Sequence, residues 1–107
     1  MSLVYHIMLH SPMGPRSGLL KLPAAGEPPL AAITLLRRQN QVAAQQPHPG
    51  EYHLSGQLDS AVGPFDFAAS LVIRNGQFDC MAHTGKGTMR LTGVQAEESK
   101  ELSLIHI

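Results

Sequence analysis

The chain has 107 residues, of which 43% are hydrophobic, and its formal net charge at pH 7 is zero with a pI near 7.0. This length favours a single domain, and the balanced charge lacks the basic surface that nucleic-acid binding requires. Cys80 is the only cysteine, which excludes an internal disulfide and a thiolate metal cluster and fits a reducing compartment.

The first residues carry no charged leader ahead of an apolar run, so they do not form a secretory signal. No stretch is apolar over the length that is needed to cross a membrane. We therefore expect a cytoplasmic protein with neither nucleic acid nor membrane as a partner.

Alternating polar and apolar residues, punctuated by glycine and proline, predict β-strands along most of the chain. The alternation is plainest from Tyr52 to Asp59 and from Phe65 to Phe67. Asn75-Gly76 between two apolar runs is the strongest single hairpin signal. In chain order, the expected strands are about 3–10, 17–22, 30–36, 41–46, 52–60, 64–73, 77–83 and 88–94.

An internal repeat organises these strands. Three segments of the form Ser/Thr-x-x-Gly start at Ser11, Ser60 and Thr84, and each stands between two predicted strands. Their starts lie 49 residues (11 to 60) and 24 residues (60 to 84) apart. A 24-residue unit predicts a fourth copy without its glycine at Leu35–Asn40, so the chain would hold four repeated hairpins.

The segment 30–46 has a competing interpretation as a helix. Its Leu, Ala, Gln and Arg residues are good helix formers, and Pro28-Pro29 could begin a helix. We predict a hairpin with its turn near Arg37–Asn40, because the repeat period requires one there.

The expected fold is all-β: an eight-stranded antiparallel meander that closes into a small barrel, since sequential strands with short connections pair in order. Residues 1–94 form this single domain, and 95–107 form a tail. The last six residues, 102–107, match one reading frame of a transposon-end adaptor used in DNA library preparation. We therefore expect them to be adaptor-derived; the alternative is an apolar C-terminal strand.

The opening and closing hairpins also resemble a protein family. The run from Leu3 to Gly14, followed by Gly18-Leu19-Leu20, looks like the opening of small uncharacterised bacterial proteins with repeated Thr-Pro-x-Gly hairpins. The run Thr84–Gly93 is similar to their closing hairpin, whereas the second hairpin and the Pro47–Gly50 loop depart from the pattern. The resemblance implies a lipocalin-like barrel and brings no catalytic residues.

Strand alternation sorts the side chains onto two faces. The polar face comprises His6, Met8, His10, His53, Ser55, Gln57, Asp59, Gln77, Asp79, Met81 and His83. The apolar face comprises Tyr5, Ile7, Leu9, Tyr52, Leu54, Gly56, Leu58, Phe65, Phe67, Ala69, Leu71, Ile73, Phe78, Cys80 and Ala82. We expect the apolar face inside, because each large apolar side chain left in water would cost roughly 1.5–3 kcal/mol.

Three polar residues share one level of the aligned repeats. His10, Asp59 and His83 stand just before each Ser/Thr-x-x-Gly turn, and imidazole and carboxylate groups suit zinc or iron. They would converge only if the polar face pointed inward. We therefore expect no metal site and no cofactor, with these three side chains in solvent and apart.

Catalytic motifs are equally weak. Ser11 or Ser60 with a nearby His and Asp has no spacing that orders a hydrolytic triad. The segment Gly85–Thr88 lacks the first glycine and the Ser/Thr after the lysine of a phosphate loop. Cys80 lies on the apolar face and is expected to be an inert thiol. We expect no enzyme.

Two functions remain open at this stage. The first is a binding module that holds an apolar small ligand in the barrel or at its open end, lined by Tyr5, Tyr52, Phe65, Phe67 and Phe78, with room left by small residues such as Gly56. The second is a scaffold or protein-interaction barrel with a filled interior, which could act as a homodimer. Met8 and Met81 on the polar face would then mark a contact patch.

Overall fold

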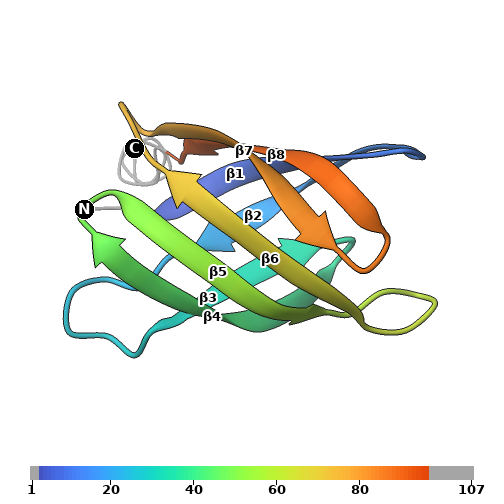
Figure 1. Ribbon diagram of the computed structural model, residues 1–107, viewed down its shortest axis with the longest axis horizontal. Coiled ribbons are helices and arrows are strands. Elements are labelled where there is room, and N and C mark those ends of the chain that lie inside the picture. Colours follow the sequence, from blue (N-terminus) through green and yellow to red (C-terminus); the bar gives the residue numbers. More distant parts are fainter. Residues whose placement is uncertain (1–2, 97–107) are drawn as a thin grey trace, which may run out of the picture.

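The computed structural model describes residues 3–96, and they form eight antiparallel strands closed into one barrel (Figure 1). The strands are β1 (Val4–Ser11), β2 (Gly14–Lys21), β3 (Leu30–Leu35), β4 (Arg38–His48), β5 (Glu51–Leu58), β6 (Phe65–Val72), β7 (Gln77–Thr84) and β8 (Gly87–Gln95). Each strand pairs with the next in sequence, and β8 closes the ring on β1. The predicted fold class is confirmed. Within residues 3–96, no helix is long and apolar enough to span a membrane.

The interior of the barrel is filled by one apolar cluster. It contains Tyr5, Ile7, Leu9, Leu20, Leu22, Ala31, Ile33, Val42, Ala44, Tyr52, Leu54, Leu58, Phe67, Ala69, Leu71, Phe78, Ala82, Met89 and Leu91. Leu3, Leu35, Phe65, Ile73 and Cys80 are partly buried against it. Among the described residues, no polar or charged residue is buried. The apolar face therefore points inward, as predicted.

Small residues do not leave the interior empty. Gly56, predicted to leave room on the inner face, is instead exposed, and a Cβ atom built on it would lie 3.0 Å from Cγ1 of Val42 on the neighbouring strand β4. A Cβ atom on Gly93 would lie 2.2 Å from Cε2 of Phe78, because the phenyl ring occupies the room that the glycine leaves across the β7–β8 pair. The side chain of a residue on a neighbouring strand thus occupies the space that a side chain at the glycine would need.

Residues 30–46 are strands and not a helix. The turn between β3 and β4 stands at Leu36 and Arg37, which have φ angles of 51° and 63°. Two successive positive φ values are the signature of the hairpin turn that matches strand twist. The predicted hairpin is confirmed, but its turn starts one residue earlier than expected, so β4 already begins at Arg38 and runs through Pro47 to His48.

Several other strand boundaries differ from the predicted ones, and two of these differences extend the barrel. β2 begins at Gly14 and not at residue 17, because the two-residue tip of the first hairpin lets Ser11 pair directly with Gly14. β8 ends at Gln95, and Ala96 is buried with its N–H donating to the carbonyl of Val4 (2.8 Å). β8 therefore extends one residue beyond the predicted strand end at 94, and the buried Ala96 follows it. The rest of the predicted tail, 97–107, lies outside the described residues.

The pairing of β6 with β7 is interrupted. Ladder pairs join only Phe67 with Thr84 and Ala68 with His83, and an isolated bridge joins Arg74 with Gln77. Phe67 and Arg74 are seven residues apart, as are Gln77 and Thr84, so the register is the same at both ends. The ladder of hydrogen bonds is therefore interrupted between these ends without a change of register, and Cys80 lies in that interval.

Truncating a core aromatic tests the packing. Phe67→Ala removes a buried ring that is 3% exposed, and we expect it to lower the free energy of unfolding by about 3–5 kcal/mol. The control His83→Ala removes an exposed side chain and should change it by less than about 0.5 kcal/mol. Urea unfolding followed by circular dichroism measures both. Equal effects of the two substitutions would contradict the assignment of the inner face.

Candidate functional site

All four hairpin turns lie at one end of the barrel, which we call the hairpin end (Figure 1). The turns are Ser11–Gly14, Leu35–Arg38, Leu58–Phe65 and Thr84–Gly87. Antiparallel strands joined in sequence return to the same end after every second strand, so turns that are far apart in the chain are brought together here. The described ends of the chain and the other connections lie at the opposite end.

Three of these turns share one hydrogen bond. The hydroxyls of Ser11, Ser60 and Thr84 donate to the carbonyl oxygens of the glycines three residues on, at 2.6, 2.6 and 2.7 Å. Those glycines have φ angles of 116°, 112° and 117°, which side chains other than glycine rarely adopt. The fixed positions of Ser/Thr-x-x-Gly therefore close the turn, and the two variable positions form its tip.

A hollow of about 420 Å³ opens at the hairpin end. Its apolar lining comes from β1, β3, β6 and β8 and includes Leu9, Leu35, Phe65 and Met89. Its volume falls in the range of small-molecule sites, roughly 300–1,000 Å³. The hollow is therefore large enough for one small ligand, and carbon atoms form most of its surface.

The tips of three hairpins add exposed apolar side chains around this hollow. Met13 is 85% exposed, Val62 is 83% exposed and Leu36 is 58% exposed. Each belongs to a different turn, and together they extend the apolar lining into solvent. Exposed large apolar groups that gather at one place are typical of binding surfaces.

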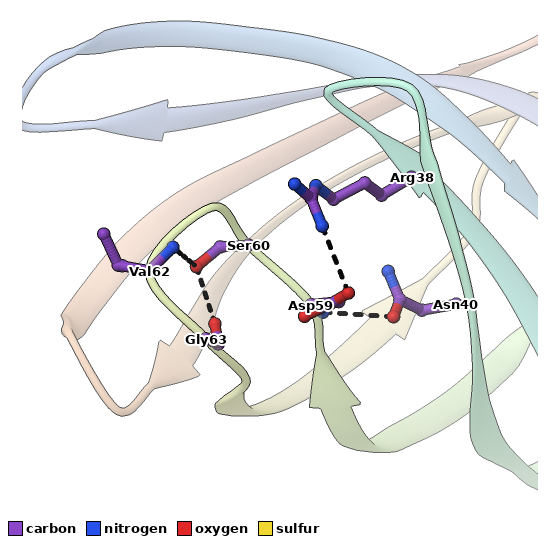
Figure 2. A network of polar contacts seen from close by, with 6 residues as sticks. All are labelled: Arg38, Asn40, Asp59, Ser60, Val62 and Gly63. Atoms are coloured by element: carbon purple, nitrogen blue, oxygen red, sulfur yellow. Dashed lines mark hydrogen bonds and ion pairs between the residues drawn. The ribbon is translucent and has the colours of Figure 1, made fainter.

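The longest turn at this end is held to the neighbouring hairpin by polar contacts, which Figure 2 shows. Nη1 of Arg38 lies 3.2 Å from Oδ2 of Asp59, and the backbone N–H of Asp59 donates to Oδ1 of Asn40 at 3.0 Å. The Ser60 hydroxyl then closes its turn on Gly63. These contacts fix the wall of the hollow on the side of β4 and β5.

Two cations border the hollow. Arg16 on β2 is half-buried, and the ammonium of Lys86 lies 4.9 Å from the centre of the Phe65 ring. Asp59 also lines the hollow, but Arg38 already neutralises it. The charge left facing the hollow is therefore positive.

Of the five aromatic residues expected to bind a ligand, four lie in the core and one lines the hollow. Tyr5, Tyr52, Phe67 and Phe78 are buried in the filled core, where the rings of Tyr5 and Phe78 pack with their centres 5.8 Å apart. Burial raises the pKa of the Tyr5 phenol, with a smaller contribution from Tyr52. Phe65 alone among the five lines the hollow.

His10, Asp59 and His83 are all exposed and do not form a cluster. Asp59 is paired with Arg38, while Nδ1 of His83 lies 3.3 Å from Oγ1 of Thr88 on the neighbouring strand. Among residues 3–96, no three His, Cys, Asp or Glu side chains come close enough to hold a metal ion. The hydroxyls of Ser11 and Ser60 bond to their own turns, which is the structural role open to turn serines.

A second hollow, of about 660 Å³, lies on the outer wall over β8, β1, β2 and β3. Met8, Leu19 and Val94 contribute to its apolar surface together with Leu36, which also borders the hollow at the hairpin end; Leu19 and Val94 are 41% and 53% exposed. Met8, expected in a contact patch, lies in this groove. Met81 is on β7 and does not line it.

Cys80 lies on the inner face of β7, where the ladder to β6 is interrupted, and is half-buried. Burial raises the pKa of its thiol to about 11, with a further contribution from the charge of Asp79. On the outer face, the Arg90 guanidinium bonds to both carboxylate oxygens of Asp79 and lowers the pKa of that carboxyl. Cys80 is therefore protonated, and so a poor nucleophile, at neutral pH.

Comparison of the chain with protein-family models, with curated proteins and with solved structures gives no match.

Sequence reasoning concentrated on the fixed residues of the repeat and missed the variable ones. Met13, Val62 and Lys86 each occupy the second variable position of a Ser/Thr-x-x-Gly turn. Large or charged side chains at turn tips, where small polar residues are usual, were the available signal.

The thiol provides a pH test. Unfolded Cys80 loses its proton near pH 9, whereas the folded thiol keeps it to about pH 11, so the unfolded state binds fewer protons in between. The free energy of unfolding should therefore fall from pH 9 to 11. Because Tyr5 contributes in the same direction, the measurement is the difference from Cys80→Ala, whose stability should fall less steeply. Parallel curves for the two proteins would contradict the burial of the thiol.

Proposed function

We propose that this protein is a non-enzymatic binding barrel that takes a small apolar ligand in the hollow at the hairpin end. The observation that carries the proposal is the carbon-lined hollow, with apolar side chains on the tips of three hairpins around it. A ligand there would cover Met13, Leu36 and Val62, whose exposure to water is otherwise unfavourable.

The filled interior favours the end of the barrel over its centre. Four of the five aromatic residues are buried in the core cluster, and the ring of Phe78 occupies the place beside the buried Gly93. An internal ligand would need to displace this packing, at a cost similar to overpacking a core. The hollow at the hairpin end needs no such rearrangement.

Fold and turn chemistry support a place among lipocalin-like small bacterial barrels. The eight-stranded meander supplies four hairpins, and the turns at Ser11, Ser60 and Thr84 share one geometry, whereas the fourth turn, at Leu36 and Arg37, is of another type. Fold alone does not define a function. The likeness to small barrels supports only the position of the site, because the open end of a barrel is a common place for a ligand. A cytoplasmic location is part of the same proposal.

A carboxylate placed in the hollow tests the site. The neutral fluorescent probe N-phenyl-1-naphthylamine should bind the wild type, and Val62→Asp should weaken binding by about tenfold, equivalent to about 1.4 kcal/mol, because the ligand must then desolvate a charge. Met81→Asp is the matched control, since it places the same group at another exposed apolar position, on the wall of β7. Its affinity should equal that of the wild type.

Two results would contradict the proposal. One is a wild type that does not bind the probe. The other is binding that Met81→Asp and Val62→Asp weaken to the same extent, since the site would then not be at the hairpin end.

A second candidate function is an interaction barrel whose partner is a second copy of the chain. The outer groove over β8, β1, β2 and β3 favours it, together with a net charge of zero, which permits self-association. This function predicts a dimer in sedimentation velocity that Leu19→Asp converts to a monomer, because Leu19 lies in the groove. A wild type that stays monomeric at every concentration would exclude it.

A further inference from the structure

Arg16 is a cation on the inner face of the barrel. In β2, Gly14, Arg16, Gly18 and Leu20 alternate with exposed residues, and Arg16 is paired with the buried Leu9 of β1. Its side chain is half-buried and lines the hollow at the hairpin end. Leu9 of β1, Phe65 of β6 and Met89 of β8 supply apolar side chains around the same hollow, whereas Arg16 brings a charge to it.

Arg16 also lacks an internal partner. Arg38 is paired with Asp59 and Arg90 with Asp79, but within residues 3–96 no acidic group and no hydrogen-bond acceptor contacts the Arg16 guanidinium. A guanidinium carries five N–H donors, and partial burial removes some of the water that would satisfy them. A bound anion would restore those hydrogen bonds.

The rest of the hollow accommodates a negative charge. Lys86 supplies a second cation, held over the Phe65 ring, and the one carboxylate in the lining, Asp59, is already bonded to Arg38. The remaining lining is mostly carbon. The hollow therefore offers an apolar surface and a polar, positively charged group at the same place.

We propose that the ligand of this hollow is a single-chain amphiphile with a carboxylate head, and that Arg16 binds the head. This inference rests on the proposed function and adds the chemical class of the ligand to it. The hydrocarbon chain lies against Leu9, Leu35 and Met89. The planar guanidinium binds a carboxylate through two parallel hydrogen bonds, which a neutral alcohol cannot form.

Decanoate and decan-1-ol separate the head from the chain, because they have the same number of carbon atoms. At pH 8 decanoate is ionised, since carboxyl groups titrate near pH 4. In isothermal titration calorimetry below micelle-forming concentrations, the wild type should bind decanoate at least about tenfold more tightly than decan-1-ol. Arg16→Gln should remove this preference by weakening decanoate binding and leaving decan-1-ol binding unchanged.

Arg74→Gln is the control variant, because Arg74 is an exposed arginine at the opposite end of the barrel and should leave both affinities at wild-type values. Phosphatidylglycerol vesicles distinguish a free amphiphile from a membrane lipid. The protein should not float with the vesicles, and flotation that depends on Arg16 would overturn the single-chain ligand.

Equal wild-type affinity for decanoate and decan-1-ol would overturn the assignment of Arg16 while leaving the apolar site intact. A loss of decanoate binding in Arg74→Gln as large as that in Arg16→Gln would also overturn it. If neither amphiphile nor the neutral naphthylamine probe binds, the proposed function itself fails.

Discussion

The structure depends on the alternation of side chains in a closed sheet. Once the eight strands form a ring, every second residue must face a single shared interior, and a row of polar side chains there would lose its water. The chain meets this constraint with an inner face that is apolar over nearly its whole length. Polar chemistry is thereby restricted to the outer wall and to the two ends.

Closure also determines what the hairpin end contains. The fixed residues of each Ser/Thr-x-x-Gly turn are used for the turn itself, through a hydroxyl bond and a glycine with positive φ. The side chains of the variable residues have no part in closing the turn, and the ring of strands places them around one hollow. Each repeat thus has fixed residues that form the turn and variable residues that line the hollow. At the second variable position, the three turns carry Met13, Val62 and Lys86, which differ in size and charge.

Much of the fold could be predicted from the sequence, because strand alternation and turn residues are local signals. The buried positions of Tyr5, Leu54 and Phe67 follow from that alternation. Arg16 could not be found in this way, since a predicted strand that begins at residue 17 leaves it outside the pattern. The hollow depends on turns distant in sequence, and the filled place beside Gly93 depends on Phe78 of another strand. Neither the hollow nor the filled place can be predicted from residues that are neighbours in the sequence.

The central claim is that the barrel is filled and that its ligand binds at the hairpin end. Nuclear magnetic resonance mapping with ¹³C-methyl and ¹⁵N-amide labels tests it most directly, on titration with the neutral naphthylamine probe. The account predicts that the largest shift changes fall on Met13, Leu35, Val62 and Met89. The largest changes at the amides of Tyr5, Tyr52 and Phe78 would contradict it, because the ligand would then occupy the interior.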